Sequence, residues 1–218
     1  MKKTICLINA RGGSKRIKNK NIILFRSKPL IYWTIKSAQE TKLYDHIFVN
    51  TDSKIIAKIA KNYGAKVPFL RPKFLSEDKT SSVDATKFFL NKISESVDNF
   101  DLLQPTSPLR TKKDIINFHK FIDKNNLISV ASISKLYNSS SMKYILKDDF
   151  SIKKLNQKDI QKNIDVFFLN GSMYYNEISY FLKYEKFIFK YTKGFKMSKK
   201  SSIDIDTHED LKLALKFK

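Results

Sequence analysis

Several features that commonly mark a function are missing from this chain of 218 residues. Its only cysteine is Cys6, so no disulfide framework can form and a reducing compartment is expected. No window approaches the roughly 18 apolar residues that a membrane-spanning helix needs. No secretory hydrophobic region follows Met1, because Asn9 and Arg11 interrupt the first apolar run. The sequence therefore predicts a cytoplasmic protein that does not enter a membrane.

Histidine clusters and the common glycine signatures are also missing. His46, His119 and His208 lie far apart along the chain, so neither a zinc site nor a histidine triad is indicated. There is no G-x-G-x-x-G motif, which argues against a dinucleotide cofactor. There is no G-x-x-x-x-G-K-[ST] motif either, which argues against a P-loop hydrolase.

Acidic residues are scarce: 42 lysines and arginines stand against 21 aspartates and glutamates, a net charge of +21. This balance raises the hypothesis of a nucleic-acid-binding protein, which would need a continuous basic face interleaved with exposed aromatic side chains. The lysines are instead spread over the whole chain, and most aromatic residues have apolar neighbours, as core residues do. We therefore expect a solvated lysine-rich surface and no nucleic-acid partner.

What the chain does contain is an alternation of short apolar runs and amphipathic segments, which predict strands and helices respectively. Asp52 or Ser53 would cap the second helix, and Gly64 would end it. The order predicts a Rossmann-like three-layer α/β/α fold with a mostly parallel sheet, in which ligands bind at the carboxyl ends of the strands. The predicted strands are 4–8, 46–50, 100–103 and 129–133, and the predicted helices are 30–39, 53–63, 84–97 and 206–217.

The alternation weakens after residue 133. A polar stretch is followed by aromatic runs at 166–175 and 180–191, which need a surface to bury against. We therefore treat 1–218 as one domain and expect 136–195 to form a small inserted subdomain, a lid or a dimer contact. Within it, Asn170-Gly171 between two apolar runs is the strongest signal for a β-hairpin turn.

The first predicted strand runs directly into Ala10-Arg11-Gly12-Gly13-Ser14-Lys15-Arg16, and Lys18-Asn19-Lys20-Asn21 follows. Two glycines let the backbone turn tightly and approach an anion with its N–H groups. Arginine and lysine add charge-assisted hydrogen bonds to phosphate oxygens. We interpret this glycine loop as a binding site for a nucleotide polyphosphate; the alternative is a Gly-Gly turn on a lysine-rich surface.

A proline-bounded segment follows the third predicted strand. It reads Leu103-Gln104-Pro105-Thr106-Ser107-Pro108-Leu109-Arg110, and its prolines restrict the backbone. Such a loop would hold Gln104, Thr106 and Ser107 in set positions for hydrogen bonding. The alternative is a rigid surface loop without a binding role.

Two carboxylates, Asp204 and Asp206, lie two residues apart, so in an extended strand both would point to one face. Paired carboxylates that no neighbour neutralises favour a divalent ion, and hard oxygen ligands suit Mg²⁺ with phosphates completing its shell. The alternatives are a solvent-facing side of a strand, or Asp206 as the N-cap of the closing helix.

Together these motifs resemble the CMP-N-acylneuraminate synthetases, the cytidylyltransferase family that activates nine-carbon sialic acids, with its legionaminate and pseudaminate relatives. The resemblance follows the chain in order over nearly its whole length. The glycine loop and the Gln-Pro-Thr-Ser-Pro-Leu-Arg run are its most specific parts. The matching segments are 10–15, 18–21, 28–30, 51–53, 70–72, 103–110, 170–171 with Tyr174, and 202–207.

The resemblance implies that the 2-hydroxyl of an α-keto sugar acid attacks the α-phosphate of CTP and releases pyrophosphate, with Mg²⁺ as cofactor. Positioning and electrostatic stabilisation can drive such chemistry. It also implies a cytoplasmic homodimer, in which the aromatic-rich insertion crosses to the partner, and a role in building cell-surface glycans.

The family's roles extend to the residues that match its motifs. The implied catalytic residues are Arg11, Lys20, Gln104, Asp204 and Asp206, the two aspartates being the Mg²⁺ ligands. The implied nucleotide-binding residues are Ala10, Arg11, Gly12, Gly13, Ser14, Lys15, Lys20, Asn21, Arg71, Ser81 and Ser82, with Arg71 and the 80–82 segment facing the cytidine. The implied residues for the sugar acid are Gln104, Thr106, Ser107, Lys143, Gln161, Asn170, Gly171 and Tyr174.

One departure from the family concerns the sugar. The family usually has an Arg-Gln pair shortly before the Asn-Gly, and its arginine helps to bind the sugar carboxylate. Here Gln161 is present, but Ile160 stands in the arginine's place. A nearby lysine, Lys158 or Lys162, lacks the bidentate fork of arginine. The sugar is therefore open between sialate, legionaminate and pseudaminate types. The remaining alternatives are a nucleotidyltransferase acting on a sugar 1-phosphate and a catalytically inactive relative serving as a binding subunit.

Overall fold

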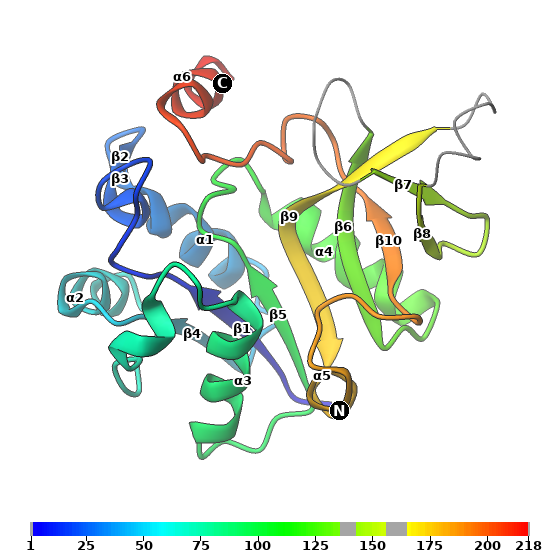
Figure 1. The fold of residues 1–218 in the computed structure, drawn as a ribbon, viewed down its shortest axis with the longest axis horizontal. Helices are drawn as coiled ribbons and strands as arrows, with labels where there is room; N and C mark the ends of the chain where they lie inside the picture. Colours follow the sequence, from blue (N-terminus) through cyan, green and yellow to red (C-terminus); the bar gives the residue numbers. More distant parts are fainter. Residues whose placement is uncertain (1, 136–142, 156–164, 218) are drawn as a thin grey trace.

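A computed structural model of the chain describes residues 2–135, 143–155 and 165–217, and Figure 1 shows their arrangement. All the predicted strands and helices are present, with changes at some ends. The strands are β1 (Thr4–Asn9), β2 (Leu24–Phe25), β3 (Lys28–Pro29), β4 (His46–Asn50), β5 (Asn99–Leu103), β6 (Ser129–Lys135), β7 (Lys143–Leu146), β8 (Ile152–Lys154), β9 (Val166–Glu177) and β10 (Lys193–Lys196). The α-helices are α1 (Leu30–Gln39), α2 (Lys54–Asn62), α3 (Ser82–Lys92), α4 (Lys112–Lys124), α5 (Ile178–Tyr184) and α6 (His208–Lys216), with 3₁₀ turns η1 (Lys20–Ile22) and η2 (Lys73–Ser76).

One large sheet organises the fold, with the strand order β10-β6-β9-β5-β1-β4 and with β7 and β8 attached beside β9. β1 pairs in parallel with β4 and β5, and β10 pairs in parallel with β6. β9 runs antiparallel to its neighbours β5, β6 and β7. The sheet is therefore mostly parallel, as expected, but a long antiparallel strand that was not foreseen occupies its middle.

Alternate side chains of β1 enter two separate hydrophobic layers. Cys6 and Ile8 pack with α1, α2 and α4, whereas Ile5 and Leu7 pack with α3 and α5. All four are fully buried. Because successive strand residues point to opposite faces, a run that is apolar at every position needs cover on both sides. Helices on both faces give the expected three-layer architecture, visible in Figure 1.

Short polar side chains set where helices begin. The Ser53 hydroxyl accepts a hydrogen bond from the N–H of Ile56, so Ser53 rather than Asp52 caps α2. Gly64 follows that helix with a φ of 84°, as expected for a helix stop.

Capping boxes explain why two helices start at other residues than the sequence predicted. Ser81 and Asp84 form such a box, so α3 starts two residues before the prediction, and it ends at Lys92 instead of residue 97. Thr207 and Asp210 form another at α6. The alternative that Asp206 is the N-cap of this helix is therefore wrong.

The hairpin predicted at Asn170-Gly171 is also wrong. β9 continues through both residues and pairs with β6 on either side of them, with a register irregularity between Ala131 and Ile133 of β6. Gly171 has a φ of 72°, a conformation that glycine adopts without steric cost. The positive φ is used in a bulge within a long strand instead of in a turn.

The range 136–195 divides between two places in the fold. β7 and β8 form an outlying antiparallel pair, whereas β9 and β10 belong to the main sheet. The expected inserted subdomain stays a prediction. α6 lies apart from that range and packs on a small cluster with Ile17, Phe25 and Leu109. Among the residues described, no helix combines the length and the apolar character required to traverse a bilayer.

Candidate active site

An open cleft of ≈ 590 Å³ lies where β1 and β5 end. The glycine loop after β1 forms one side of it, together with Asp204 and Asp206. Residues of the segment from Arg71 to Ala85 contribute another side, and Gln104 and Thr106 a third. This is the edge at which ligands bind in parallel α/β sheets.

Most residues that the sequence singled out reach this cleft. The implied site residues that line it are Arg11, Ser14, Lys15, Lys20, Asn21, Arg71, Ser81, Ser82, Gln104, Thr106, Gly171, Asp204 and Asp206. Those that do not line it are Ala10, Gly12, Gly13, Ser107, Lys143, Asn170 and Tyr174. Gln161 lies outside the described residues, as do Ile160, Lys158 and Lys162.

The glycine loop is held by contacts with its neighbours. The N–H of Gly12 donates to Asp52 Oδ1 over 2.9 Å, and Asn21 Nδ2 donates to the Arg11 carbonyl over 3.0 Å. A Cβ on Gly12 would lie 3.1 Å from the Cβ of Ser53, so glycine permits this close approach to the start of α2. The loop is thereby fixed while its cationic side chains reach the cleft.

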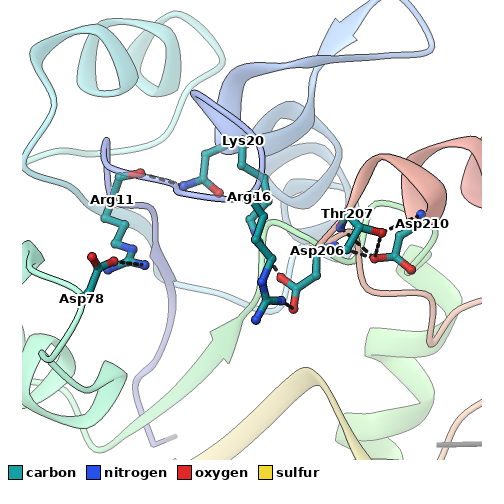
Figure 2. A network of polar contacts seen from close by, with 8 residues as sticks. Arg11, Arg16, Lys20, Asp78, Asp206, Thr207 and Asp210 are labelled. Atoms are coloured by element: carbon teal, nitrogen blue, oxygen red, sulfur yellow. Dashed lines mark hydrogen bonds and ion pairs between the residues drawn. The ribbon is translucent and has the colours of Figure 1, made fainter.

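Two carboxylates in the cleft each pair with two cations, so positive charge remains in excess. Arg11 Nη2 lies 3.1 Å and Lys15 Nζ lies 2.6 Å from the carboxylate of Asp78. Arg16 Nη1 lies 2.9 Å and Lys20 Nζ lies 2.6 Å from that of Asp206. Figure 2 shows Arg11 turned toward Asp78, and Arg16 and Lys20 turned toward Asp206.

The premise that no neighbour neutralises the carboxylate pair therefore does not hold for Asp206. Its two oxygens each accept a hydrogen bond from a cation, Lys20 or Arg16. Partial burial raises the pKa of Asp206, but these hydrogen bonds and charges outweigh it, so the pKa lies below its usual value.

The pKa of Asp204 shifts in the opposite direction, above its usual value. Asp204 is open to the cleft, but the surrounding protein removes part of its water, and this loss of solvation raises its pKa. A hydrogen bond with Thr106 opposes the rise, and the nearby charge of Asp206 adds to it. The two carboxylates repel one another across the cleft wall.

The segment that carries this pair is not an extended strand. Residues 203–206 are irregular, with Ile205 donating its N–H to the Thr106 carbonyl over 2.8 Å. Ile205 is buried beneath α6, while Asp204 and Asp206 on either side line the cleft. The two-residue spacing thus places both carboxylates on the cleft side without any strand pairing.

The donor set at Asp204 and Asp206 suits a hard divalent cation. Within the described ranges, no group of three or more His, Cys, Asp and Glu side chains could hold a metal by itself. Two carboxylates leave most coordination positions to water and to phosphate oxygens, as Mg²⁺ sites in nucleotide enzymes do. A divalent cation would also relieve the repulsion that raises the pKa of Asp204.

Arg110 organises the proline-bounded loop from inside the core. Its Nη1 donates to the carbonyls of Gln104 (3.2 Å) and Ser172 (2.9 Å), and its Nη2 donates to Thr34 Oγ1 (2.8 Å). Burial lowers the pKa of Arg110 to about 10. This buried guanidinium ties Gln104 to β9 and α1. Ser107, in contrast, is fully buried and does not face the cleft.

The side chain of Asn170 is hydrogen-bonded within a cluster of serines beside the cleft. It is buried, its Nδ2 donates to Ser134 and Ser202, and its Oδ1 accepts from the N–H of Ser172. These bonds satisfy the amide within the protein and leave Gly171, next in the chain, to line the cleft. Tyr174 lies beyond the cleft lining, and burial raises its pKa to about 12.

Arg71 lines the opposite side with a nearly buried side chain. Its Nε donates to Ser76 Oγ over 2.9 Å, and Asp52 lies 3.9 Å from its Nη2. Burial lowers the pKa of Arg71, although Asp52 opposes the shift. The Ser81 hydroxyl is engaged at the start of α3, so its part in the cleft wall is set by the helix cap.

Sequence reasoning missed several residues that the fold brings to the cleft, among them Asn9, Arg16 and Asp78. Asn9 ends β1 directly before the glycine loop, a position that could have identified it. Arg16 lies inside the loop but was not assigned a role. Asp78 belongs to no recognisable motif, and only its ion pairs with Arg11 and Lys15 identify it.

Comparison with known proteins places this architecture in a family. The family model described as "Cytidylyltransferase" matches residues 5–218. The chain is 33% identical to the pseudaminic acid cytidylyltransferase of Campylobacter jejuni strain 81-176, over 97% of this chain and 94% of that protein. It is 35% identical to the CMP-N,N'-diacetyllegionaminic acid synthase of Legionella pneumophila, with the same coverage of both.

Other matches are longer or more distant. The N-acylneuraminate cytidylyltransferase of Escherichia coli is 33% identical over 98% of this chain, but the chain spans only 51% of that protein. The chain thus spans about half the length of several curated relatives. A solved CMP:2-keto-3-deoxy-manno-octonic acid synthetase complexed with CTP has a TM-score of 0.80 at 15% identity, covering 98% of this chain and 97% of that one. At that identity the likeness shows a common fold.

Proposed function

The chain belongs to the cytidylyltransferase family, and we propose that it joins CTP to a nine-carbon α-keto sugar acid of the sialic, legionaminic or pseudaminic type. The products are the CMP-sugar and pyrophosphate. The observation that carries the proposal is a cleft lined both by the cations of the glycine loop and by Asp204 and Asp206. The relatives named for pseudaminic and legionaminic acids, which this chain matches over 94% of their length, support the class of sugar.

The cationic side of the cleft would bind the triphosphate. Arg11, Lys15 and Lys20 present their charged ends there, and Asn21 fixes the loop that carries Arg11. Arginine offers a planar fork of donors to phosphate oxygens, and lysine offers a compact point charge. Arg71 with the 80–82 segment would face the cytidine, since both lie on the neighbouring wall.

Asp204 and Asp206 would hold Mg²⁺, with phosphate oxygens as further ligands. When bound, the ion would withdraw charge from the phosphates and promote loss of the proton from the attacking hydroxyl. Thr106 orients the Asp204 carboxylate through its hydrogen bond. Lys20 and Arg16 keep Asp206 ionised, as its lowered pKa indicates.

In the proposed transfer, the 2-hydroxyl oxygen of the sugar acid forms a bond to the α-phosphorus, and the bond from that phosphorus to the bridging oxygen breaks. Pyrophosphate leaves with the bonding electrons. Lys20 and Arg11 would stabilise the charge on the phosphate oxygens, and Gln104 would position the sugar acid. The hydroxyl proton would pass to solvent water, and we assign no residue as a separate general base.

The remaining elements of the proposal are a homodimer in the cytoplasm and a sugar site completed by Lys143, Gln161 and Tyr174. Support for the dimer comes from a group of aromatic side chains on and after α5. Tyr180 and Tyr184 stack against Phe189, and Tyr191 beside them is 46% exposed. Light scattering coupled to size-exclusion chromatography would test the dimer, with a mass near 25.5 kDa contradicting it.

The decisive experiment measures pyrophosphate release from CTP and Mg²⁺ with N-acetylneuraminate, legionaminate and pseudaminate in parallel. Release with CTP and one of these acids is expected, and the reactive acid identifies the substrate. GTP with a sugar 1-phosphate serves as the control. Activity in that control together with silence for all three acids would overturn the proposal in favour of sugar 1-phosphate nucleotidyl transfer.

A further inference from the structure

We infer that Asp78 is an internal competitor of the nucleotide: its carboxylate pairs with Arg11 and Lys15, and the phosphates of the nucleotide or of pyrophosphate replace it. The inference rests on the proposed function, because it assumes that these two cations bind phosphate. It adds a residue that sets the affinity of the site without itself contacting the bound anion.

The geometry of Asp78 is that of an anion bound by the glycine loop. One oxygen, Oδ1, lies 3.1 Å from Arg11 Nη2, and the other, Oδ2, lies 2.6 Å from Lys15 Nζ. Arg11 Nη1 also donates to the Glu77 carbonyl over 3.2 Å. A short segment between η2 and α3 therefore places one carboxylate against both cations, as Figure 2 shows for Arg11.

The exposure of these side chains makes the contact exchangeable. Arg11, Lys15 and Asp78 are 36%, 77% and 44% exposed, so water can replace each partner. Exposed ion pairs of this kind contribute little stability, because solvent screens them and long side chains lose rotamer freedom. A phosphate chain carries more charge and more acceptor oxygens than one carboxylate, so it would displace Asp78.

The second carboxylate of the cleft has a different task. Asp206 also forms ion pairs with two loop cations. Asp204 lies near it, however, and the two carboxylates together form an oxygen donor set for a divalent ion. The ion pairs described for the Asp78 carboxylate are those with Arg11 and Lys15. Its contacts are therefore explained by the cations alone.

Competition by Asp78 has a consequence for both ends of the reaction. It would weaken the binding of CTP, and it would assist the departure of pyrophosphate by recapturing Arg11 and Lys15. Removing the charge of Asp78 should therefore strengthen the binding of both CTP and pyrophosphate. If Asp78 only ordered the glycine loop for its ligand, removing the Asp78 charge would instead weaken the binding of CTP and pyrophosphate.

The test compares the wild type with Asp78→Asn and with Glu77→Gln in calorimetric titrations with inorganic pyrophosphate, without metal. Glu77 is the matched control: it is exposed beside the same cleft, and its carboxylate forms no ion pair in the part of the chain that the structure describes. We expect Asp78→Asn to lower the Kd of pyrophosphate about fivefold, and Glu77→Gln to lower it by less than about twofold. Thermal unfolding would verify that both variants are folded.

Kinetics with the sugar acid substrate provide a second readout that a structural role would not move. Asp78→Asn should lower the KM for CTP, leave the KM for the sugar acid unchanged, and strengthen inhibition by pyrophosphate. An unchanged or raised Kd for pyrophosphate in Asp78→Asn, with wild-type binding intact, overturns the inference alone. If the wild type binds pyrophosphate tightly but transfers no cytidylyl group, the proposed reaction is wrong. The pyrophosphate titrations of the wild type and Asp78→Asn then still test the competition. Absence of any pyrophosphate binding by the wild type overturns both.

Discussion

The carboxylates of the cleft and the carboxylate of Asp101 in the core face similar partners in contrasting surroundings. Asp78 and Asp206 are paired with long lysine and arginine side chains at a water-filled surface. Asp101 on β5 is fully buried, accepts a hydrogen bond from the Tyr44 hydroxyl, and lies 2.7 Å from His119 Nε2 of α4. Both places pair negative with positive or polar groups, but only the cleft leaves room for exchange.

The difference follows from solvation. At Arg11 and Lys15, water and phosphate can replace the carboxylate at little cost, because both side chains are solvent-exposed. In the core, a carboxylate that loses a partner keeps an unpaired charge in a medium of low polarity. The same type of contact is thus expected to serve binding in the cleft and folding in the core. Four predictions test this contrast.

The largest effect is expected from Lys20→Ala. Lys20 is only 18% exposed, faces Asp206, and lines the cleft at the proposed triphosphate site. Loss of a positioned cation should lower kcat/KM for CTP about 10³-fold. Lys18→Ala is the control, since Lys18 belongs to the same loop but does not line the cleft. Equal activities of the two variants would contradict the assignment.

Asp101→Asn should reduce stability instead of activity. Breaking a buried charged pair is expected to lower the free energy of unfolding by about 3 kcal/mol, measured by urea denaturation. Tyr44→Phe, which removes a single hydrogen bond to the same carboxylate, should cost about 1 kcal/mol. If Asp101→Asn unfolds at the same urea concentration as the wild type, the buried carboxylate does not stabilise the fold, and the proposed contrast with the cleft carboxylates is wrong.

Asp204→Asn tests the metal assignment within the cleft. We expect kcat with saturating Mg²⁺ to fall about 100-fold, because one of two anionic donors is lost. Stability should not decrease, since the raised pKa of Asp204 indicates that its charge is disfavoured in the folded protein. Titration of activity with Mg²⁺ is the measurement. Full turnover in this variant would make the metal assignment wrong.

The smallest effect is a pH dependence of stability from His119. Burial lowers the pKa of His119, but the charge and hydrogen bond of Asp101 raise it more, so its pKa lies above the ordinary 6.5. The contribution to stability is then fully present below pH 6.5 and is lost as the pH rises through the folded pKa. The stability difference between the wild type and His119→Gln, measured in urea, should therefore be larger at pH 6 than at pH 9. An equal difference at both values would show that the pair is uncharged.

Much of the fold was predictable because its signals are local. The helix at Leu30–Gln39 has the predicted bounds, and β4 does as well. Both depend on the spacing of apolar residues within one segment. The glycine loop after β1 was found for the same reason, since its cations adjoin the strand in the sequence.

The failures occur where distant segments, or a stronger local signal, compete with the preference that was read from the sequence. Asn170-Gly171 has the composition of a hairpin turn, but pairing of β9 with β5, β6 and β7 keeps the strand continuous through it. Asp206 resembled a helix N-cap, but Thr207 makes the cap and Lys20 with Arg16 engage Asp206. Strand pairing thus outweighs the turn signal at Asn170-Gly171, whereas at Asp206 the local capping box of Thr207 and Asp210 sets the helix start.

The residue pattern alone was therefore sufficient for the three-layer α/β architecture, and it singled out the glycine loop and the two aspartates that line the cleft. That the loop binds phosphate and the aspartates bind Mg²⁺ stays a prediction. Only the folded arrangement could reveal that Asp78 meets Arg11 and Lys15, or that Tyr44, Asp101 and His119 share one buried site. Periodicity and turn chemistry are properties of neighbouring residues. Which carboxylate meets which cation depends on strand order and on how the chain returns across the sheet, and no local pattern encodes that.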